Sequence, residues 1–563
     1  MTPTPRPKGG AAIGLDSSWL GASLPDIDDL GLPSFNTRII GRFPVEQAHH
    51  RPNAPALEFP AERASWTYRE FVDDAASIAA GLKALGLEPG DRVGIMLPNR
   101  SEFVLVWFAS LFCGTIDVGL NHGLVHDALA HQLQLARPRL VVCDADSCKA
   151  ILAVRDRLPS LETLVVVGSM PAEEAGLRVI PFDDLRTPTS GFEFTFGAPR
   201  DITSIRYTSG TTGPAKAVAS TNSQKSVSTA MFVHLMGFQA DDRLYTPFPL
   251  HHSMASMMGV VASFQAGGCC VVDSRFSASQ YWSRVGQFQA TLGHILDPLV
   301  PMLLRQSESP SDHGHKCRKL WTARANPQFE TRFHTALLPH YSMSEAAPVA
   351  YPPSDMPNRA GSSGRVGRLF AVRIADENDY PVPAGARGEI LLRPTFPHTM
   401  MAGYFGDIEA TASATRGLWF HTGDEGYLDA DGFLFLIGRM GDQIRRRGVN
   451  IPAEQVENAA RDHPSVEDAA AVAVPSEFGE SDIKLVLIPT AMNRLPVPDE
   501  LRRHLAARLP KEMIPRYIEW RTSFPLTPTH KVSKAALRAE GVNGLTESTL
   551  DLDPHRTTDG NAR

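Results

Sequence analysis

The sequence predicts an α/β protein: a large N-terminal domain of layered sheets and helices, followed by a small α+β C-terminal domain. Helical stretches alternate with short strands rich in valine and isoleucine, a pattern typical of parallel sheets buried between helices. The chain has 563 residues, which is enough for more than one domain and a large core. Its composition changes near Gly438, and we expect the domain boundary there.

The first element with clear ends is a helix that begins after Thr67. Thr67 and Glu70 have the spacing of a capping box, apolar residues recur at helical spacing between positions 75 and 85, and Gly86 can close the helix. The apolar stretch 103–116 is too short to span a bilayer and predicts a buried helix. Short apolar runs predict strands at residues 93–97, 140–143, 164–167 and 205–207.

The chain divides into four predicted segments. Residues 1–35 are rich in proline, glycine and serine and predict a loose N-terminal extension. Residues 36–438 form the large domain, and residues 439–538 form the C-terminal domain, with its own helix over 499–509. Residues 539–563 are polar, and we expect a disordered tail there.

The composition is that of a globular protein, with 43% apolar and 21% charged residues. The 55 basic and 62 acidic residues give a net charge of −7, which does not favour nucleic acid as a partner. We expect a cytoplasmic protein, because the sequence shows neither a secretory signal nor a membrane-spanning stretch. Six scattered cysteines are too few for a disulfide scaffold and indicate reduced thiols. His313, His315 and Cys317 have no second ligand cluster at zinc-site spacing, so we interpret them as loop residues.

A run of small and hydroxylated residues follows the strand predicted to end at Tyr207. Glycines let the backbone turn tightly and bring N–H groups and hydroxyls to an anion, and a lysine adds positive charge. The run is not a Walker A motif, which requires Gly-Lys-Ser/Thr at the start of a helix. It predicts a phosphate-binding loop that consists of Thr208, Ser209, Gly210, Thr211, Thr212, Gly213 and Lys216.

This loop resembles the signature of the adenylate-forming superfamily, which comprises acyl-CoA synthetases, luciferases and the adenylation domains of peptide synthetases. The resemblance extends over roughly residues 40–538. It implies that the large domain binds ATP and a carboxylic acid and forms an acyl-adenylate and pyrophosphate. It also implies that the C-terminal domain is mobile and rotates before the acyl group passes to a second nucleophile.

Two further segments resemble motifs of this superfamily. Tyr341-Ser-Met-Ser-Glu345 is similar to its Tyr-Gly-x-Thr-Glu segment, which implies that Tyr341 lies against adenine, Ser344 bonds the α-phosphate and Glu345 binds Mg²⁺. Trp419-Phe-His-Thr-Gly-Asp424 is similar to its nucleoside motif. By that match Asp424 accepts hydrogen bonds from the ribose hydroxyls, and Arg439 reaches the ribose from the domain junction.

The predicted catalytic set also includes His252 and Lys531, beside Ser344 and Glu345. Phe248-Pro-Leu-His-His252 resembles a Pro-Leu-Phe-His segment, whose histidine lies near the entrance of the acyl pocket. Pro525-Leu-Thr-Pro-Thr-His-Lys531 resembles a C-terminal Pro-x-Thr-x-x-Gly-Lys motif. By that match Lys531 contacts both the carboxylate and the α-phosphate during adenylation.

The resemblance implies ATP and Mg²⁺ as cofactors and a small carboxylic acid as substrate. CoA is the predicted acceptor, since the runs at 363–367 and 442–450 resemble carnitine/crotonobetaine–CoA ligases. An amine or a carrier-protein thiol is the alternative acceptor, and another small oxyacid such as nitrite is an alternative substrate. A third hypothesis is a non-catalytic binding protein with the same fold. The presence of the motif residues argues against it.

Several positions differ from the superfamily pattern, namely Ala217, Ser342, Gly441 and His530. Arg324 is also unusual, and we expect it to reach into the acyl pocket towards a second acidic group. The run Arg445, Arg446 and Arg447 either meets the phosphates of CoA or forms a solvated basic face. These positions leave the acid and the acceptor open.

Overall fold

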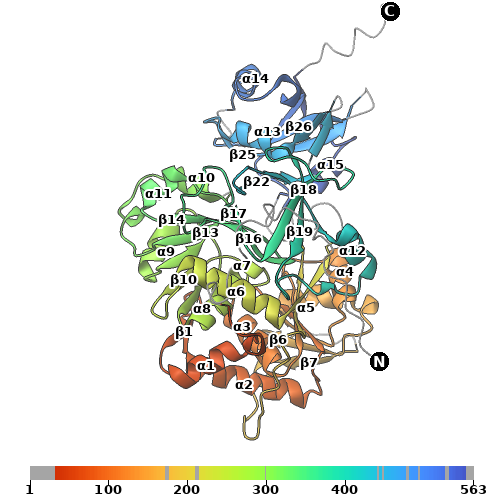
Figure 1. Ribbon diagram of the computed structural model, residues 1–563. Coiled ribbons are helices and arrows are strands. Elements are labelled where there is room, and N and C mark those ends of the chain that lie inside the picture. The colour runs from red at the N-terminus through yellow and green to blue at the C-terminus, as the bar shows by residue number, and fades with distance from the viewer. Residues whose placement is uncertain are drawn as a thin grey trace, which may run out of the picture.

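The computed structural model describes residues 32–170, 176–208, 215–297, 299–440, 443–446, 449–476, 481–491, 495–526 and 532–552. Figure 1 shows a large lower body and a small upper body, drawn in blue, that holds the C-terminal part of the chain. The predicted α/β fold with a large N-terminal and a small C-terminal domain is confirmed. Of the extension predicted over 1–35, all but the last four residues lie outside the described part.

One large sheet has eight strands in the order β20-β9-β8-β4-β3-β5-β6-β7. Six strands, from β8 through β4, β3, β5 and β6 to β7, run parallel. At the edge beside β8, β9 runs antiparallel to β8, and β20 runs antiparallel to β9. All four strands predicted from the sequence lie in this sheet, as β3, β5, β6 and β8. The bounds are β3 Arg92–Met96, β4 Ile116–Gly119, β5 Leu140–Asp144, β6 Thr163–Val167, β7 Arg178–Pro181, β8 Ile202–Tyr207, β9 Ala217–Thr221 and β20 Gly403–Tyr404.

The second large sheet has seven strands in the order β14-β13-β12-β10-β11-β1-β2. All but β2 run parallel, so the carboxyl ends of β10, β12, β13 and β14 meet at one edge. The bounds are β1 Pro55–Phe59, β2 Ala64–Thr67, β10 Arg243–Thr246, β11 Cys269–Val272, β12 Leu292–His294, β13 Lys319–Thr322 and β14 Ala336–Pro339. Ligand sites are expected at such an edge in open α/β sheets.

The helix α2 (Tyr68–Ala84) begins where the capping box predicts. Thr67 accepts a hydrogen bond from the Glu70 amide, and the Glu70 carboxylate accepts one from the Thr67 amide. The helix predicted over 103–116 is shorter and forms α3 (Ser101–Phe112). It ends early because Gly114, with φ of 71°, turns the chain towards β4.

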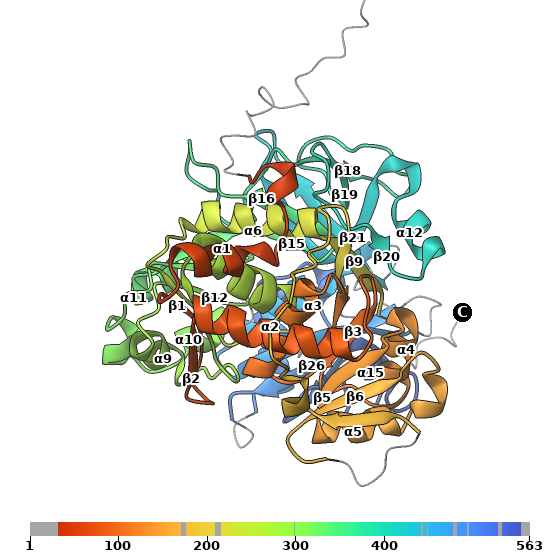
Figure 2. The ribbon, with the colours of Figure 1, turned by 90° about the horizontal axis from the view of Figure 1, so that it is seen from below.

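The two large sheets share one hydrophobic core. Within α3 every residue except Glu102 is buried, which explains the apolar run in the sequence. Phe108 of α3 packs against Phe71 of α2 and Phe264, with ring centroids 5.3 and 5.1 Å apart. The same core contains residues of both sheets, so α2 and α3 join the sheets into one body (Figure 2).

Two smaller sheets lie between this body and the C-terminal domain. One contains β15 Tyr341–Met343, β16 Ala346–Tyr351 and β17 Arg365–Val366, and the other contains β18 Phe370–Ala375, β19 Gly388–Pro394, β21 Phe420–Leu428 and β22 Leu434–Arg439. The remaining helices of the large domain are α1 Arg42–His50, α4 His126–Ala136, α5 Ala145–Leu152, α6 Asn222–Met236, α7 Ser253–Ala255, the π-helix Ser256–Val261, α8 Ala262–Ala266, α9 Tyr281–Gln287, α10 Leu299–Leu304, α11 Pro327–Phe333 and α12 Ile408–Ala414.

In its described residues the C-terminal domain has a hairpin, a four-stranded sheet and three α-helices. These are β23 Gln443–Arg446, β24 Val449–Pro452, α13 Ala453–Arg461, β25 Val466–Pro475, β26 Ser481–Pro489, α14 Pro498–Ala506, β27 Tyr517–Trp520, α15 Lys534–Ala539 and β28 Leu550–Asp551. The prediction of a disordered tail from residue 539 is wrong as far as residue 552. Leu550 pairs with Ile518, and Asp551 forms an ion pair with Arg516, so this segment adds a strand to the sheet.

Lys484 and Glu519 form a buried ion pair in this domain, with Nζ 2.6 Å from Oε2. Burial would raise the pKa of Glu519, but hydrogen bonds from Arg521 and Lys484 outweigh it and lower the pKa to about 2. The unfolded value is about 4.3, so this contribution to stability is complete above that pH and is lost as the pH falls to about 2.

We therefore expect Glu519→Gln to lower the free energy of unfolding by about 3–5 kcal/mol at pH 7, because Lys484 loses its buried partner. Urea unfolding measures this loss, which should shrink as the pH falls from about 4 towards 2. The exposed Glu377, changed to Gln, is the control and should have no effect. Equal stability of the Glu519 variant and the parent protein at pH 7 would contradict the assignment.

Candidate active site

Asp424 lies at the centre of a hydrogen-bonded group close to the domain junction. The register of β21 and β22 places it opposite Arg439, whose Nε lies 2.9 Å from Asp424 Oδ1. Tyr341 donates its hydroxyl to Oδ2 at 2.7 Å. Burial and the neighbouring carboxylate raise the pKa of Tyr341 well above its usual value, so the hydroxyl stays a donor. Three residues predicted to contact the nucleoside are thus brought together.

Glu345 lies in the turn between β15 and β16 and is buried. Gln224 of α6 donates to the carbonyl oxygens of Ser344 and Glu345 at 3.4 and 3.3 Å, which fixes this turn. Burial raises the pKa of the Glu345 carboxyl, so the carboxylate form gains from a nearby cation. A carboxylate oxygen is also a ligand that Mg²⁺ prefers, and the residue therefore fits a magnesium site.

Tyr404 of β20 connects Glu345 with the predicted phosphate loop. Its hydroxyl donates to Glu345 Oε1 at 3.2 Å, and the Lys216 ammonium lies 4.8 Å from the centre of its ring. The loop is closed at its base, where the Thr208 amide donates to the Lys216 carbonyl and the Lys216 amide to Thr208 Oγ1, both at 3.0 Å. The loop residues Ser209, Gly210, Thr211, Thr212 and Gly213 lie outside the described part of the chain.

A buried group of charged side chains, Asp117, Arg206 and Lys225, lies next to this site. Arg206 precedes the loop by two residues and pairs with Asp117. Burial and the charge of Arg206 lower the pKa of Lys225 to about 7, while the charges of Asp117 and Glu345 act in the opposite direction. The charge of Lys225, on α6, therefore interacts with that of Glu345, in the turn that also carries Ser344.

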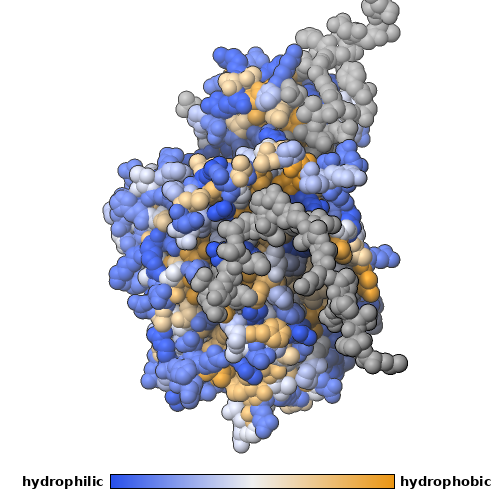
Figure 3. Space-filling view, in the orientation of Figure 1, coloured by the Kyte–Doolittle hydropathy of each residue, from blue (hydrophilic) through white to orange (hydrophobic). Residues whose placement is uncertain are grey.

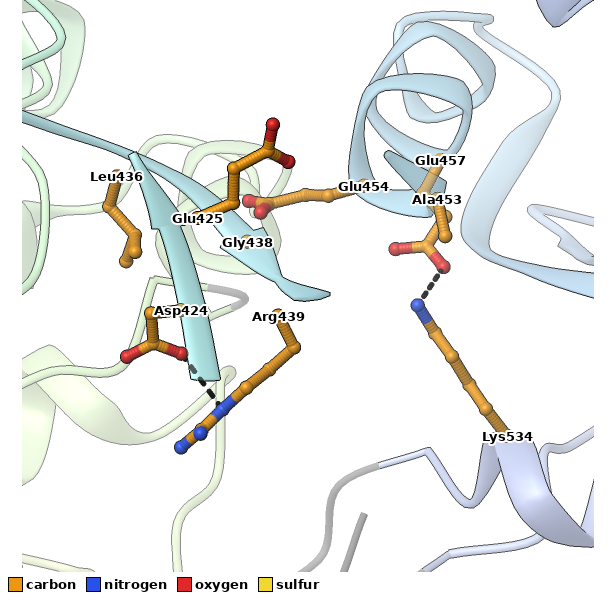
Figure 4. Close-up of a pocket in the computed structure, with 9 residues that line it drawn as sticks. All are labelled: Asp424, Glu425, Leu436, Gly438, Arg439, Ala453, Glu454, Glu457 and Lys534. Atoms are coloured by element: carbon orange, nitrogen blue, oxygen red, sulfur yellow. Dashed lines mark ion pairs between the residues drawn. The ribbon is translucent and has the colours of Figure 1, made fainter. Parts of the chain in front are cut away.

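A cavity of about 300 Å³ opens between the domains beside Asp424 (Figure 4). The large domain contributes Asp424, Glu425, Leu436, Gly438 and Arg439, and the C-terminal domain contributes Ala453, Glu454, Glu457 and Lys534. Lys534 Nζ lies 2.8 Å from Glu457 Oε1. Lys534 follows the predicted catalytic Lys531 by three residues, and Lys531 itself lies outside the described residues.

His252 caps the N-terminus of α7, after the carboxyl end of β10. Its ring centre lies 4.4 Å from that of His251, and its carbonyl accepts hydrogen bonds from the amide and hydroxyl of Ser256. The structure thus places it at the edge of the seven-stranded sheet where the parallel strands end. Its predicted role at the entrance of the acyl pocket stays a prediction.

Two arginines occupy positions other than those expected. Arg324 pairs with Glu454 of the C-terminal domain, at 2.7 Å between Nη2 and Oε1, and its predicted contact in the acyl pocket stays a prediction. Arg446 is buried and pairs with Asp482, at 2.9 Å between Nε and Oδ1, so it does not belong to a solvated face. The side chain of Arg445 and the whole of Arg447 lie outside the described part of the chain. Both contacts satisfy charges within the protein, which the position of an arginine along the chain does not reveal.

Asp379, Glu389 and His421 have ligand atoms close enough to hold a metal ion. Arg416 already approaches both carboxylates, at 3.5 and 3.6 Å, and His421 Nδ1 lies 2.8 Å from Glu389 Oε2. We interpret this group as an internal ion network.

His315, in the segment predicted to be a loop, stacks on Trp282 with ring centres 4.3 Å apart.

Tyr404, Gln224 and Lys225 are the site residues that sequence reasoning missed. Gln224 and Lys225 stand in a helix, and Tyr404 in a short Gly-Tyr-Phe-Gly turn, so none belongs to a polar motif. No helix is predicted at 222–236 from the sequence, and in the structure residues 222–232 of this helix are all buried. Within the described chain, no helix is long and apolar enough to cross a membrane.

Two family models match the chain: AMP-binding enzyme over residues 45–405, and AMP-binding enzyme C-terminal domain over residues 455–531. The chain belongs to the AMP-binding enzyme family. The predicted membership of the adenylate-forming superfamily is thereby confirmed, and the chain belongs with the AMP-forming acid–thiol ligases of this family.

Among curated proteins, this AMP-binding enzyme is similar to the crotonobetaine/carnitine–CoA ligase of Salmonella paratyphi B. The two are 28% identical over 482 residues, which cover 84% of this chain and 93% of the relative. The ligase of the same name from Salmonella typhi is 29% identical over 466 residues, or 81% of this chain and 89% of the relative. The homology is therefore distant but nearly full-length.

Solved structures, two CoA ligases among them, have the same fold as this AMP-binding enzyme. The anthranilate CoA ligase AuaEII, in complex with anthranoyl-AMP, has a TM-score of 0.80 at 24% identity, over 91% of this chain and 98% of that one. ATP-bound MatB from Rhodopseudomonas palustris has a TM-score of 0.76 at 22% identity, over 88% and 98%. The o-succinylbenzoate CoA synthetase of Bacillus subtilis, in complex with AMP, also scores 0.76 at 22%, over 90% and 99%.

For this AMP-binding enzyme we expect Tyr341→Phe to lower the free energy of unfolding by about 1–2 kcal/mol, because the buried Asp424 loses a hydrogen-bond donor. Chemical unfolding at neutral pH measures the change. Tyr380 is 70% exposed, and Tyr380→Phe is the matched control, which should leave stability unchanged. The same stability for both variants would show that the hydroxyl does not hold Asp424.

Proposed function

We propose that this AMP-binding enzyme activates a carboxylic acid with ATP and transfers the acyl group of the resulting acyl-adenylate to the thiol of CoA. The observation that carries the proposal is the arrangement of Asp424 between Tyr341 and Arg439, next to a cavity at the domain junction. A carboxylate whose two oxygens are already oriented is suited to receive the two hydroxyls of a ribose.

In the first half-reaction, a carboxylate oxygen of the acid attacks the α-phosphorus of ATP. The bond from that phosphorus to the bridging oxygen breaks, and pyrophosphate leaves. Both reactants are anions, so Lys216, Lys531 and the donors of the loop at 208–213 are proposed to supply positive potential where charge accumulates. When bound, Mg²⁺ would neutralise phosphate charge, and Glu345 is the residue proposed to hold it.

In the second half-reaction, the sulfur of CoA attacks the carbonyl carbon of the acyl-adenylate. A carbon–sulfur bond forms, the bond to the phosphate oxygen breaks, AMP leaves and the thiol gives up its proton. The names of the relatives and of the solved structures support CoA as the acceptor. We infer no particular acid from them, since the identity to the curated relatives is 28%.

The decisive experiment incubates the protein with ATP, Mg²⁺ and a panel of carboxylic acids, each with and without CoA, and analyses the products by mass spectrometry. The panel should include aromatic, aliphatic, dicarboxylic and quaternary-ammonium acids. We expect one class to give acyl-AMP without CoA and acyl-CoA with it.

Other products would redirect the proposal. Acyl-AMP that is not converted by CoA would indicate an amine or a carrier-protein thiol as acceptor. No adenylate from any carboxylic acid would contradict the proposal, and nitrite would be the next substrate to test.

Lys531→Ala should lower adenylation by roughly 10²–10³-fold, the loss expected for one preorganised group that stabilises charge. Acyl transfer from a supplied acyl-adenylate to CoA should remain, since the proposed role is confined to the first half-reaction. Pyrophosphate release and acyl-CoA formation measure the two steps separately. Lys149, whose side chain is 74% exposed, gives the matched control Lys149→Ala. An equal loss in both steps would contradict the role of Lys531.

A further inference from the structure

Two arginines of the large domain contact opposite ends of helix α13 in the C-terminal domain. Arg324 Nη2 lies 2.7 Å from the carboxylate of Glu454, in the first turn of the helix. At the other end, Arg305 donates to the carbonyl oxygens of Arg461 at 3.3 Å, Val466 at 3.1 Å and Glu467 at 2.7 Å. Arg305 directly follows helix α10, which Figure 1 shows below the strand β25.

Both contacts have the polarity that a helix favours. A carboxylate near the N-terminus and a guanidinium at the C-terminal carbonyls each interact favourably with the helix dipole. The nine residues of α13 span about 13 Å, so the two arginines hold the helix at separated points. We call this pair of contacts the interdomain clamp: Arg305 and Arg324, with their partners on α13 and at the start of β25.

The Arg324 side of the clamp is fixed from the carboxyl edge of the seven-stranded sheet. Asp297, three residues after β12, accepts hydrogen bonds through Oδ1 from the amides of Ala323 and Arg324, both at 3.1 Å. Thr322 Oγ1 donates to the same oxygen at 2.8 Å, and Arg324 Nε lies 3.7 Å from Asp297 Oδ2. The guanidinium is therefore oriented by its own domain before it meets Glu454.

The helix that the clamp holds also forms a wall of the cavity beside Asp424 (Figure 4). Glu454 and Glu457 line this cavity, and Glu457 binds Lys534, the first residue of α15. Lys534 is three residues from Lys531 along the chain. A set of contacts thus leads from Arg324 through α13 to Lys534 at the start of α15.

We propose that Arg305 and Arg324 are positioning residues for adenylation, which hold α13, and through Glu457 also Lys534 of α15, at the cavity beside Asp424 and Arg439. The inference rests on the proposed function, in which Lys531 serves the first half-reaction only. The resemblance to the superfamily implies that the C-terminal domain rotates before transfer, so loss of the clamp should slow adenylation and spare transfer. Arg305 and Arg324 themselves are not proposed to touch substrate.

A double-mutant cycle of Arg324→Ala, Glu454→Ala and the double variant tests the clamp in the full-length protein. Hydrogen exchange of the α13 peptides reports the interface, and pyrophosphate release and transfer from a supplied acyl-adenylate report the half-reactions. We expect each single variant to lower α13 protection and adenylation about three- to fivefold, the range for a partly exposed ion pair. The double variant should lose no more than the worse single variant, and transfer should be unchanged.

Arg305→Ala provides a second variant at the other end of α13 and should give the same pattern. Arg324→Lys keeps the charge and should recover most of the adenylation rate. Arg157, on the surface of the large domain and paired with Asp127, gives the control Arg157→Ala, which should change neither readout. Unchanged exchange in α13, additive losses in the cycle, or equal losses in both half-reactions would overturn the proposal.

The two proposals fail separately. If no acid supports adenylation, the proposed function fails, while hydrogen exchange in the cycle still decides whether the clamp exists. If an acid is found and α13 exchange does not respond to Arg324→Ala, the clamp fails and the proposed function stands.

Discussion

The carboxylate of Asp424 is buried close to the domain junction. It is stabilised there because Tyr341 donates a hydrogen bond to one of its oxygens and Arg439 forms an ion pair with the other. Tyr341 comes from the three-stranded sheet and the other two from the four-stranded sheet, so one carboxylate joins two sheets. Without these partners the burial of the charge would be costly. Arg439 is also the last residue of β22, and its ion pair therefore fixes the point from which the chain leaves the large domain.

In the rest of the site, neutral aromatic and amide side chains hold the charged residues in place. Tyr404 lies between Lys216 and Glu345, and Gln224 holds the turn that carries Glu345. Such neutral donors orient charged groups at little electrostatic cost, which is how a site can be preorganised for phosphate chemistry. The buried Lys225 shares this field and has a pKa of about 7, since burial disfavours its protonated form.

Much of the fold and of the nucleoside site could be predicted from the sequence, because those signals are local. The capping box at Thr67 and the strand that leads into Tyr207 depend on neighbours within a few residues. Long-range contacts are not predictable in this way: nothing near Arg324 or Arg446 in the sequence indicates their partners Glu454 and Asp482. The polar composition of residues 539–552 predicts disorder, and it gives no sign of the short strand that pairs with β27.

The sequence by itself determined the class of fold, the ordered set of motifs and the superfamily, since each of these is written in residue type and spacing. Only the tertiary structure decided which side chains meet. It joined Tyr341 to Asp424 and Glu345 to Tyr404, and it paired Arg324 with Glu454 across the domains. The physical reason is that an ion pair or a hydrogen bond depends on distance in space, and residues far apart along the chain carry no local pattern that announces their partner.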